Sequence, residues 1–439
     1  MKNYLVLITL LVSVSVFSQK KWTLQECVTH ALENNITVKQ GENTLLSIDQ
    51  DVIAAKGNFY PNLSANVNQG LSIGNVELFQ GEFADRTANT TRIGLNVNQT
   101  IFNGFRNTSV YKQSKINRQA NELELNRIRD DISLNVANAY LNILFNLENL
   151  EIAEAQYNFS VQNLEQVKGL VDAGVQPRAN IFDAEATLAN DEQSLTIADN
   201  NYRLSILSLS QLLQVPYEGF DVEVIEVDTP SEALLYDDVA PILNYAMENR
   251  NEIKAAEKNI ESSQLGTEIS KSGFYPTVTF GYGFGSNVFF SNLVNDEDAF
   301  FEQLNNQKSH SFNVNVSIPI FSRFFNKTNV AKSLIFEENS KLNLEQAKLN
   351  LESVIQRAFT DAQAAFKTYL AAQKSLAAQE LAFDNSQERY NIGAMNAFDL
   401  EQARFRLINA QSSLVNAKYD FVFKTKVLDF YQGKQIILD

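Results

Sequence analysis

Four short segments of the chain alternate between apolar and polar side chains. They cover residues 63–73, 92–98, 278–285 and 311–318, and Gln69 interrupts the apolar positions of the first one. Alternation with a period of two predicts β-strands that have one apolar and one polar face. The polar positions are mostly Asn, Ser, Thr and Gly, which suit contact with water.

Two structures are compatible with such strands. The first is a transmembrane β-barrel with apolar residues facing lipid and polar residues facing a lumen. The second is a half-buried antiparallel sheet in a soluble domain. Under the first interpretation, four strands cannot close a barrel, because small closed barrels need about eight. Open sheet edges are not tolerated in lipid, so several chains must contribute strands, and three chains would supply twelve.

Helical periodicity fills most of the remaining sequence. The predicted helices cover residues 23–57, 103–173, 179–214, 322–391 and 397–431. The first opens at Thr23, a favourable N-cap residue. The two longest have about 70 residues each and would extend roughly 100 Å. Each is followed by a shorter helix that runs back antiparallel, as in a coiled-coil hairpin.

The sequence is organised as two similar halves. Ala31-Leu32-Glu33-Asn34 returns as Ala246-Met247-Glu248-Asn249, and Phe59-Tyr60-Pro61 returns as Phe274-Tyr275-Pro276. Each half has the same predicted order of helix, strand, loop, strand, long helix and returning helix. We therefore expect an internal two-fold repeat. The predicted parts are a signal peptide at 1–18, a first repeat at 19–214, a linker with a short strand-like segment at 215–238, and a second repeat at 239–439.

The N-terminal residues indicate export. A short basic start, an apolar run from Tyr4 to Phe17 and the small residue Ser18 are typical of a cleaved secretory signal. No later segment approaches the ~20 apolar residues of a transmembrane helix. The chain has one cysteine, so it forms no internal disulfide, and its net charge of −16 argues against a nucleic-acid partner.

No residue set indicates catalysis or a cofactor. His30 and His310 are the only histidines and are far apart in the sequence. The glycines between Gly281 and Gly285 lie within a strand pattern, with no helix following that could hold a phosphate. We therefore expect neither an enzyme nor a cofactor or metal site.

The chain resembles the TolC-type outer membrane efflux proteins over essentially its whole mature length. The resemblance is carried by residues 22–28, by Asn34-Asn35, by residues 249–253 and by Gly393 with Phe398-Asp399-Leu400. It implies a long antiparallel α-helical coiled-coil barrel, continuous with a transmembrane β-barrel that trimerisation closes. It also implies an outer-membrane location with a long periplasmic extension.

The resemblance implies a function and partners as well. Such a protein is the exit duct of a tripartite efflux or type I secretion system, and it conducts substrates passively. Its expected partners are two further copies of the chain, a periplasmic adaptor (membrane fusion protein), an inner-membrane transporter and outer-membrane lipid. The alternative is a trimeric outer-membrane adhesin with a coiled-coil stalk, against which the internal duplication argues. The sequence does not specify the substrate.

The candidate site residues lie at the two helical turns. Gly174 and Val175 at the first turn, and Gly393 and Ala394 at the second, are expected to contact the adaptor. The alternative is that each glycine only ends a helix and contacts no partner, as many glycines at such turns do. The resemblance implies that Tyr390, Asp399 and Asp183 surround the periplasmic aperture, where three copies of each acid would form a charged ring. Asp399 would equally suit the first turn of a helix, where a carboxylate is favourable.

Overall fold

The computed structural model describes residues 21–225, 236–294 and 297–434. The predicted signal peptide at 1–18 lies outside the described residues. None of the described helices combines the length and the apolar character needed to cross a membrane.

The chain divides into two units, which are described separately. The first contains the described residues up to Glu42, Glu124–Ile253 and those from Gln346 onward; the second contains Asn43–Leu123 and Lys254–Glu345.

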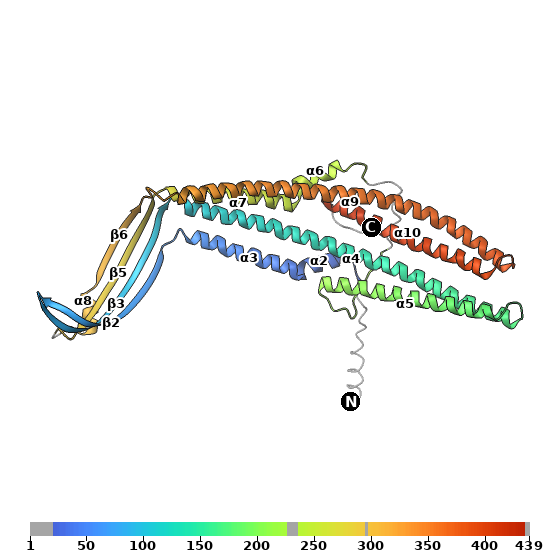
Figure 1. Ribbon diagram of the computed structural model, residues 1–439, viewed down its shortest axis with the longest axis horizontal. Helices are drawn as coiled ribbons and strands as arrows, with labels where there is room; N and C mark the ends of the chain where they lie inside the picture. Colours follow the sequence, from blue (N-terminus) through green and yellow to red (C-terminus); the bar gives the residue numbers. More distant parts are fainter. Residues whose placement is uncertain (1–20, 226–235, 295–296, 435–439) are drawn as a thin grey trace, which may run out of the picture. The chain divides into compact units, whose positions relative to one another are not determined.

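An antiparallel sheet dominates the second unit. Its strands are β2 (Asn62–Phe79), β3 (Glu82–Asn103), β5 (Thr277–Ser291) and β6 (Ser309–Ser317), which lie side by side in the order β2-β3-β5-β6 (Figure 1). The strands β2, β3 and β5 extend well beyond the predicted segments. Backbone pairing continues there after the apolar alternation has ended, so the sequence pattern underestimates their length.

Strand register sorts the side chains into an apolar and a polar face. One row across the sheet joins Leu63, Val97, Tyr282 and Phe312, and its neighbour on the other face joins Ser64, Asn96, Gly283 and Ser311. Leu63 is 67% exposed and Phe312 is 72% exposed. The apolar face at these edge strands is therefore not covered by the described part of this chain, although covering it would be favourable.

A short helix lies in the connection that the sequence predicted to be a loop. α8 (Phe300–Asn306) packs against β5, where β5 continues past the end of β6. The backbone N–H of Phe289 donates to Oε1 of the buried Gln303 at 2.8 Å, and Oγ of Ser286 donates to the carbonyl of Leu304 at 2.7 Å. The helix thus occupies a sheet edge that would otherwise be open.

Four helices form two hairpins. α4 (Arg106–Asp172) and α9 (Phe325–Asn391) have 67 residues each, and α5 (Ala179–Leu213) and α10 (Ala397–Tyr431) have 35 each. At 1.5 Å per residue the long helices extend about 100 Å, as predicted. α4 begins later than predicted because Phe102 and Asn103 still pair within the sheet.

The predicted helix at 23–57 is in fact two helices. α2 (Leu24–Asn34) ends at Asn35, whose ψ of 133° is not helical, and α3 (Ile36–Gly57) follows. The Asn35 amide stabilises the break by accepting from the backbone N–H of Thr37 at 2.9 Å and donating to the carbonyl of Leu212 at 3.1 Å. The prediction of Thr23 as N-cap is confirmed, with a capping box to Glu26.

The same break occurs in the second half of the chain. α6 (Ala240–Asn249) and α7 (Asn251–Lys271) are separated by Arg250, and the single turn η1 (Ser272–Phe274) leads into β5. Arg250 has a ψ of 137°, so the interruption has similar geometry in both halves.

The strand-like segment that the sequence predicts in the linker covers residues 220–227, of which 226 and 227 lie outside the described residues; the described part contains a strand of two residues. β4 (Asp221–Val222) pairs in parallel with β1 (Lys21–Trp22) only. Tyr140 of α4 fixes this pair, because its buried hydroxyl donates to the carbonyl of Glu223 at 2.5 Å.

Both connections from strand to long helix use left-handed backbone. Gly104 and Phe105 have φ of 64°, and Arg323 and Phe324 have φ of 49° and 65°. A Cβ on Gly104 would lie 2.7 Å from Cβ of Tyr275 and 2.8 Å from the carbonyl oxygen of Ser272. Only glycine therefore fits the first connection without displacing backbone.

We expect Gly104→Ala to destabilise the second unit by about 2–3 kcal/mol, because positive φ and a backbone clash add together. Gly174→Ala is the matched control: φ is 73°, but the new methyl group would meet no atom within 4 Å. It should cost about 1 kcal/mol. Hydrogen exchange of the backbone amides next to each glycine measures both effects locally, and equal changes in the opening free energy would contradict the expected effect of the clash.

Candidate functional site at the hairpin tips

The two hairpins of the first unit end in the same backbone motif. The N–H of Gly174 donates to the carbonyl of Val171 at 3.0 Å, and the N–H of Val175 donates to that of Leu170 at 2.9 Å. In the second hairpin Gly393 donates to Tyr390 at 2.9 Å and Ala394 to Arg389 at 2.8 Å. This is the Schellman arrangement, and it requires the left-handed φ of 73° and 75° at the two glycines.

Apolar side chains are exposed around both tips. Val175 is 68% exposed, and Phe182, Ile392 and Phe398 are exposed to a similar or greater degree. Gly174, Gly393 and Ala394 present exposed backbone beside them. A small exposed apolar surface can bind another protein, and adaptor contact at these turns stays a prediction.

A cavity of about 330 Å³ lies between the two hairpins near the tips. Asp183, Tyr390, Phe398 and Glu401 line it, with amide side chains around them. Nε2 of Gln176 donates to Oη of Tyr390 at 3.4 Å, and so links the first tip to the second hairpin. The structure thus brings Asp183 and Tyr390 to one cavity.

Asp399 does not line that cavity. It is exposed in the first turn of α10, where its N–H donates to Oδ1 of the N-cap residue Asn396 at 2.8 Å. Nδ2 of Asn396 donates to Oδ2 of Asp399 at 2.9 Å. The structure therefore places Asp399 in the first turn of the helix, as the alternative interpretation predicted.

A buried charged network lies next to the cavity, and the sequence analysis missed it. Arg404 of α10 donates from Nη1 to Oγ of Ser160 in α4 and from Nη2 to Oδ2 of Asp191 in α5, both at 3.0 Å. Ser160 donates to Asp191 as well. Nε of Arg404 donates to Glu401, which lines the cavity, at 3.0 Å. The network joins the two hairpins.

A second charged cluster surrounds Arg250. Its guanidinium lies 3.5 Å from Oδ2 of Asp130 and 3.3 Å from Oε1 of Glu252, and it stacks over the ring of Phe430 at 4.3 Å. Burial raises the pKa of Asp130 and Asp131, and neighbouring arginines offset part of that rise. These carboxyls hold their protons more tightly in the folded state, so their contribution to stability is lost as pH rises through the raised pKa.

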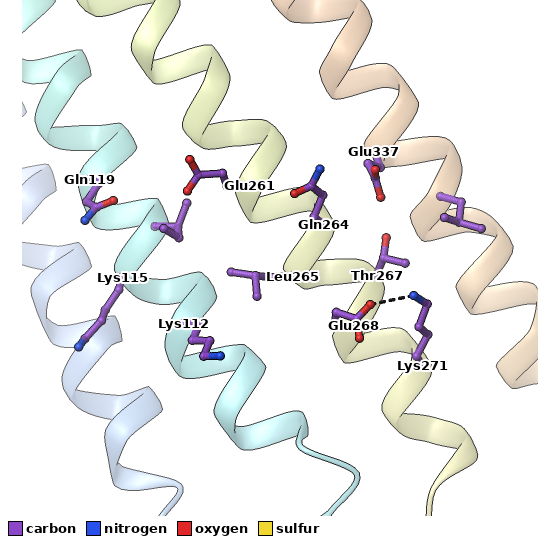
Figure 2. A pocket seen from close by; sticks show the side chains of 12 residues that line it. Lys112, Lys115, Gln119, Glu261, Gln264, Leu265, Thr267, Glu268, Lys271 and Glu337 are labelled. Carbon is purple, nitrogen blue, oxygen red and sulfur yellow. Dashed lines mark hydrogen bonds and ion pairs between the residues drawn. The ribbon is translucent and has the colours of Figure 1, made fainter.

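A groove of about 670 Å³ in the second unit has mixed charge. Figure 2 shows lysines from α4 and α7 and glutamates from α7 and α9 around it. Lys271 forms an ion pair with Glu268 at 2.7 Å. The charges balance, and within the described part of the chain no three His, Cys, Asp or Glu residues are grouped to hold a metal ion. The groove therefore offers no chemical centre.

Comparison with known proteins identifies the family. The model of the family described as "Outer membrane efflux protein" matches residues 27–214 and matches again over residues 242–429. Together these two matches cover most of the chain. The chain belongs to the outer membrane efflux protein family, and it resides in the outer membrane.

Individual relatives agree with this assignment. The chain is 22% identical to the outer membrane protein TolC of Vibrio cholerae serotype O1 over 387 residues, which cover 88% of this chain and 86% of that protein. It is 22% identical to the outer membrane efflux protein BepC of Brucella suis biovar 1 over 413 residues, covering 92% and 84%. A crystal structure of CusC superposes with a TM-score of 0.78 at 18% identity, covering 96% of both chains.

These findings confirm the resemblance and the mainly helical fold with an antiparallel sheet. Function as an outer membrane efflux protein follows from the family. The alternative of an adhesin is not favoured, and the relatives are named as outer membrane proteins rather than enzymes.

Proposed function

We propose that this protein is the outer-membrane exit duct of a tripartite efflux or type I secretion system. The observation that carries the proposal is the sheet. Apolar rows cover one face, amide, hydroxyl and glycine positions form the other, and both edge strands are exposed. Such a sheet is suited to lipid on one side and water on the other.

The open edges are the argument for several copies, and the number three is what the resemblance to the TolC-type proteins implies. β2 and β6 each pair on one side only among the described strands. Lipid cannot satisfy the free N–H and C=O groups of an edge, so the edges must pair with other chains. Pairing β6 of one copy with β2 of the next closes a twelve-stranded barrel from a homotrimer, wide enough for an aqueous lumen.

The long helices would extend from this barrel into the periplasm and form an antiparallel coiled-coil tube. At their tips, Gly174, Val175, Gly393 and Ala394 would contact a periplasmic adaptor, which joins the duct to an inner-membrane transporter. The exposed apolar side chains at both tips support this arrangement. In this proposal the energy for export comes from the transporter.

Asp183, Tyr390 and Asp399 would control the periplasmic aperture. Asp183 and Tyr390 line one cavity between the hairpins, and Gln176 bonds to Tyr390 across it. Asp399 stands exposed at the start of α10. Three copies of its carboxylate around a narrow mouth would attract cations.

The two-part organisation of the chain belongs to the same proposal. A first repeat at 19–214 and a second at 239–439, joined by the linker at 215–238, would give each copy two equivalent hairpins. The double match of the family model and the matched Schellman turns support this division.

Conductance in planar lipid bilayers tests the function. The wild type should form a cation-selective channel, and Asp399→Asn should lower the cation-to-anion permeability ratio about fivefold, since a charge at 4 Å in water is worth about 1 kcal/mol. Asn396→Ala is the matched control, because it removes the helix cap but keeps the carboxylate. Correctly inserted protein that never conducts would contradict the duct, and unchanged selectivity in Asp399→Asn would contradict the acidic ring.

A further inference from the structure

Four connections join the sheet of the second unit to its helices. They run from α3 to β2, from β3 to α4, from α7 to β5 and from β6 to α9, and they lie at one end of the sheet (Figure 1). Together with one turn of each helix, they cover residues 54–61, 103–109, 268–276 and 318–328. We call these four segments the collar.

Direct contacts hold the four segments of the collar side by side. Nδ2 of Asn107 donates to the carbonyl of Asn58 at 2.9 Å, and Nδ2 of Asn326 donates to the carbonyl of Gly273. Gly104 lies close against the turn η1. These three contacts connect all four segments, so the collar is one surface and not four separate loops.

The collar is basic, although the whole chain is acidic with a net charge of −16. Its segments contain five Lys and Arg residues and a single carboxylate, Glu268, which forms an ion pair with Lys271 at 2.7 Å. The other four bases are exposed and form no ion pair with any described residue: Lys56, Arg106, Arg323 and Lys327. The collar therefore carries positive charge that the described part of the chain does not neutralise.

Helix stabilisation explains only part of this charge. Lys56 and Lys271 lie in the last turns of α3 and α7, where a base is favourable. Arg106 begins α4 and Lys327 lies in the first turn of α9, where a base is unfavourable, and neither of these first turns contains an acid. The bases at the two helix starts thus need a partner of negative charge.

Exposed aromatic rings accompany the bases. Phe274 is 54% exposed and Phe324 is 67% exposed. Three of the bases lie within three residues of such a ring: Lys56 of Phe59, Lys271 of Phe274, and Arg323 of Phe324. Aromatic and basic side chains are enriched together where a membrane protein passes from hydrocarbon into the headgroup region.

The position of the collar decides between lipid and protein as the partner, and here the inference rests on the proposed function. In the proposed duct, lipid covers the apolar face of the sheet, and the collar lies where that face ends. Ile320, in the connection from β6 to α9, is 95% exposed and continues the apolar face into the collar. The collar is thus level with the headgroups of the leaflet from which the helices emerge.

We propose that the collar binds anionic phospholipid headgroups of that leaflet. The aromatic rings pack beside the upper part of the acyl chains, and Arg106, Arg323 and Lys327 bind the phosphates. An anionic headgroup offers each base the negative charge that the described part of the chain lacks, and such attraction is strong next to a membrane surface. The lipid also offsets the repulsion between these bases and the starts of α4 and α9.

Headgroup selectivity tests the proposal. The protein purified from the outer membrane is reconstituted in phosphatidylcholine vesicles that contain a minor share of phosphatidylglycerol, and spin-labelled forms of both lipids report association. Phosphatidylglycerol should associate with the wild type about fivefold more strongly than phosphatidylcholine, which is the effect of one base at an anionic headgroup. The preference should disappear at about 1 M salt, where charges are screened beyond ~3 Å.

Charge removal locates the site. A triple variant with Arg106→Gln, Arg323→Gln and Lys327→Gln should lose the preference for phosphatidylglycerol and still fold, because these side chains are exposed and form no ion pair with described residues. The matched control removes three exposed bases of the first unit and should keep the preference: Arg178→Gln, Lys367→Gln and Lys374→Gln. Both triple variants are also measured for conductance and ion selectivity in planar bilayers.

Each other outcome overturns the proposal in a recognisable way. A conducting wild type that associates equally with both lipids does not bind anionic headgroups. A preference that survives in the collar variant is made by other residues, and if the ion selectivity of that variant changes instead, the three bases face the lumen. Protein that inserts in the vesicles but never conducts would contradict the proposed duct, whereas the lipid preference would still be measurable.

Discussion

Arg404→Ala is expected to destabilise the tip half of the helices by about 3–5 kcal/mol, which is the usual result of removing one partner from a buried ion pair. Arg404 and Asp191 are both buried, and Ser160 is almost fully enclosed between them. The truncation leaves the Asp191 carboxylate and the Ser160 hydroxyl without the guanidinium that bonds to both. An unpaired charge in such surroundings costs far more than the pair contributed.

Hydrogen exchange of the backbone amides in α5 and α10 measures this effect locally, which avoids treating the whole protein as a two-state system. Arg406→Ala is the matched control, because Arg406 lies on the same helix, is exposed and bonds only to the carbonyl of Gln402 among the contacts described. It should change the opening free energy by less than about 0.5 kcal/mol.

A triple replacement separates charge from packing. Changing Arg404 to Met, Asp191 to Leu and Ser160 to Ala together should restore most of the stability, because apolar groups of similar volume replace the whole network. If the backbone amides of α5 and α10 exchanged no faster in Arg404→Ala than in Arg406→Ala, the network would not hold the hairpins together. A destabilised triple variant would mean that the register between the two hairpins depends on the charges themselves.

The long helices and the existence of the strands could be predicted from the sequence, because each leaves a periodic trace over many residues. The breaks at Asn35 and Arg250 could not. Each occurs at a single residue whose extended backbone is stabilised by contacts from distant segments, such as Asn35 with Leu212. The length of β3 was also underestimated, since its outer part pairs without alternating apolar residues.

At the candidate site, the turns were predictable and the network was not. Gly174 and Gly393 were predictable because each turn needs a left-handed backbone, which favours glycine. Arg404 bonds to Ser160 of α4 and to Asp191 of α5, and the local sequence of α10 contains neither partner. One signal was available: Arg404 follows Leu400 and Ala403 on the buried stripe of α10, where a charge requires a partner.

Val314→Arg is expected to prevent accumulation of folded trimer in the outer membrane, whereas Asn315→Arg is expected to be tolerated. The two residues are adjacent on β6 and both are exposed in the single chain, so a soluble sheet would accept either change. They point to opposite faces. Val314 pairs with Phe280 on the apolar face, and Asn315 pairs with Thr279 on the polar face.

The physical reason for the difference would be the solvent on each side of the proposed barrel. Arginine on the lipid face near the bilayer midplane costs about 2–4 kcal/mol in each chain, and a trimer carries it three times. In the lumen the same side chain stays in water and changes only the ion selectivity. The measurement is the amount of heat-modifiable trimer in purified outer membranes for both variants. Equal amounts would mean that the apolar rows of this sheet do not face lipid, because only lipid makes the two faces of β6 unequal for a charge.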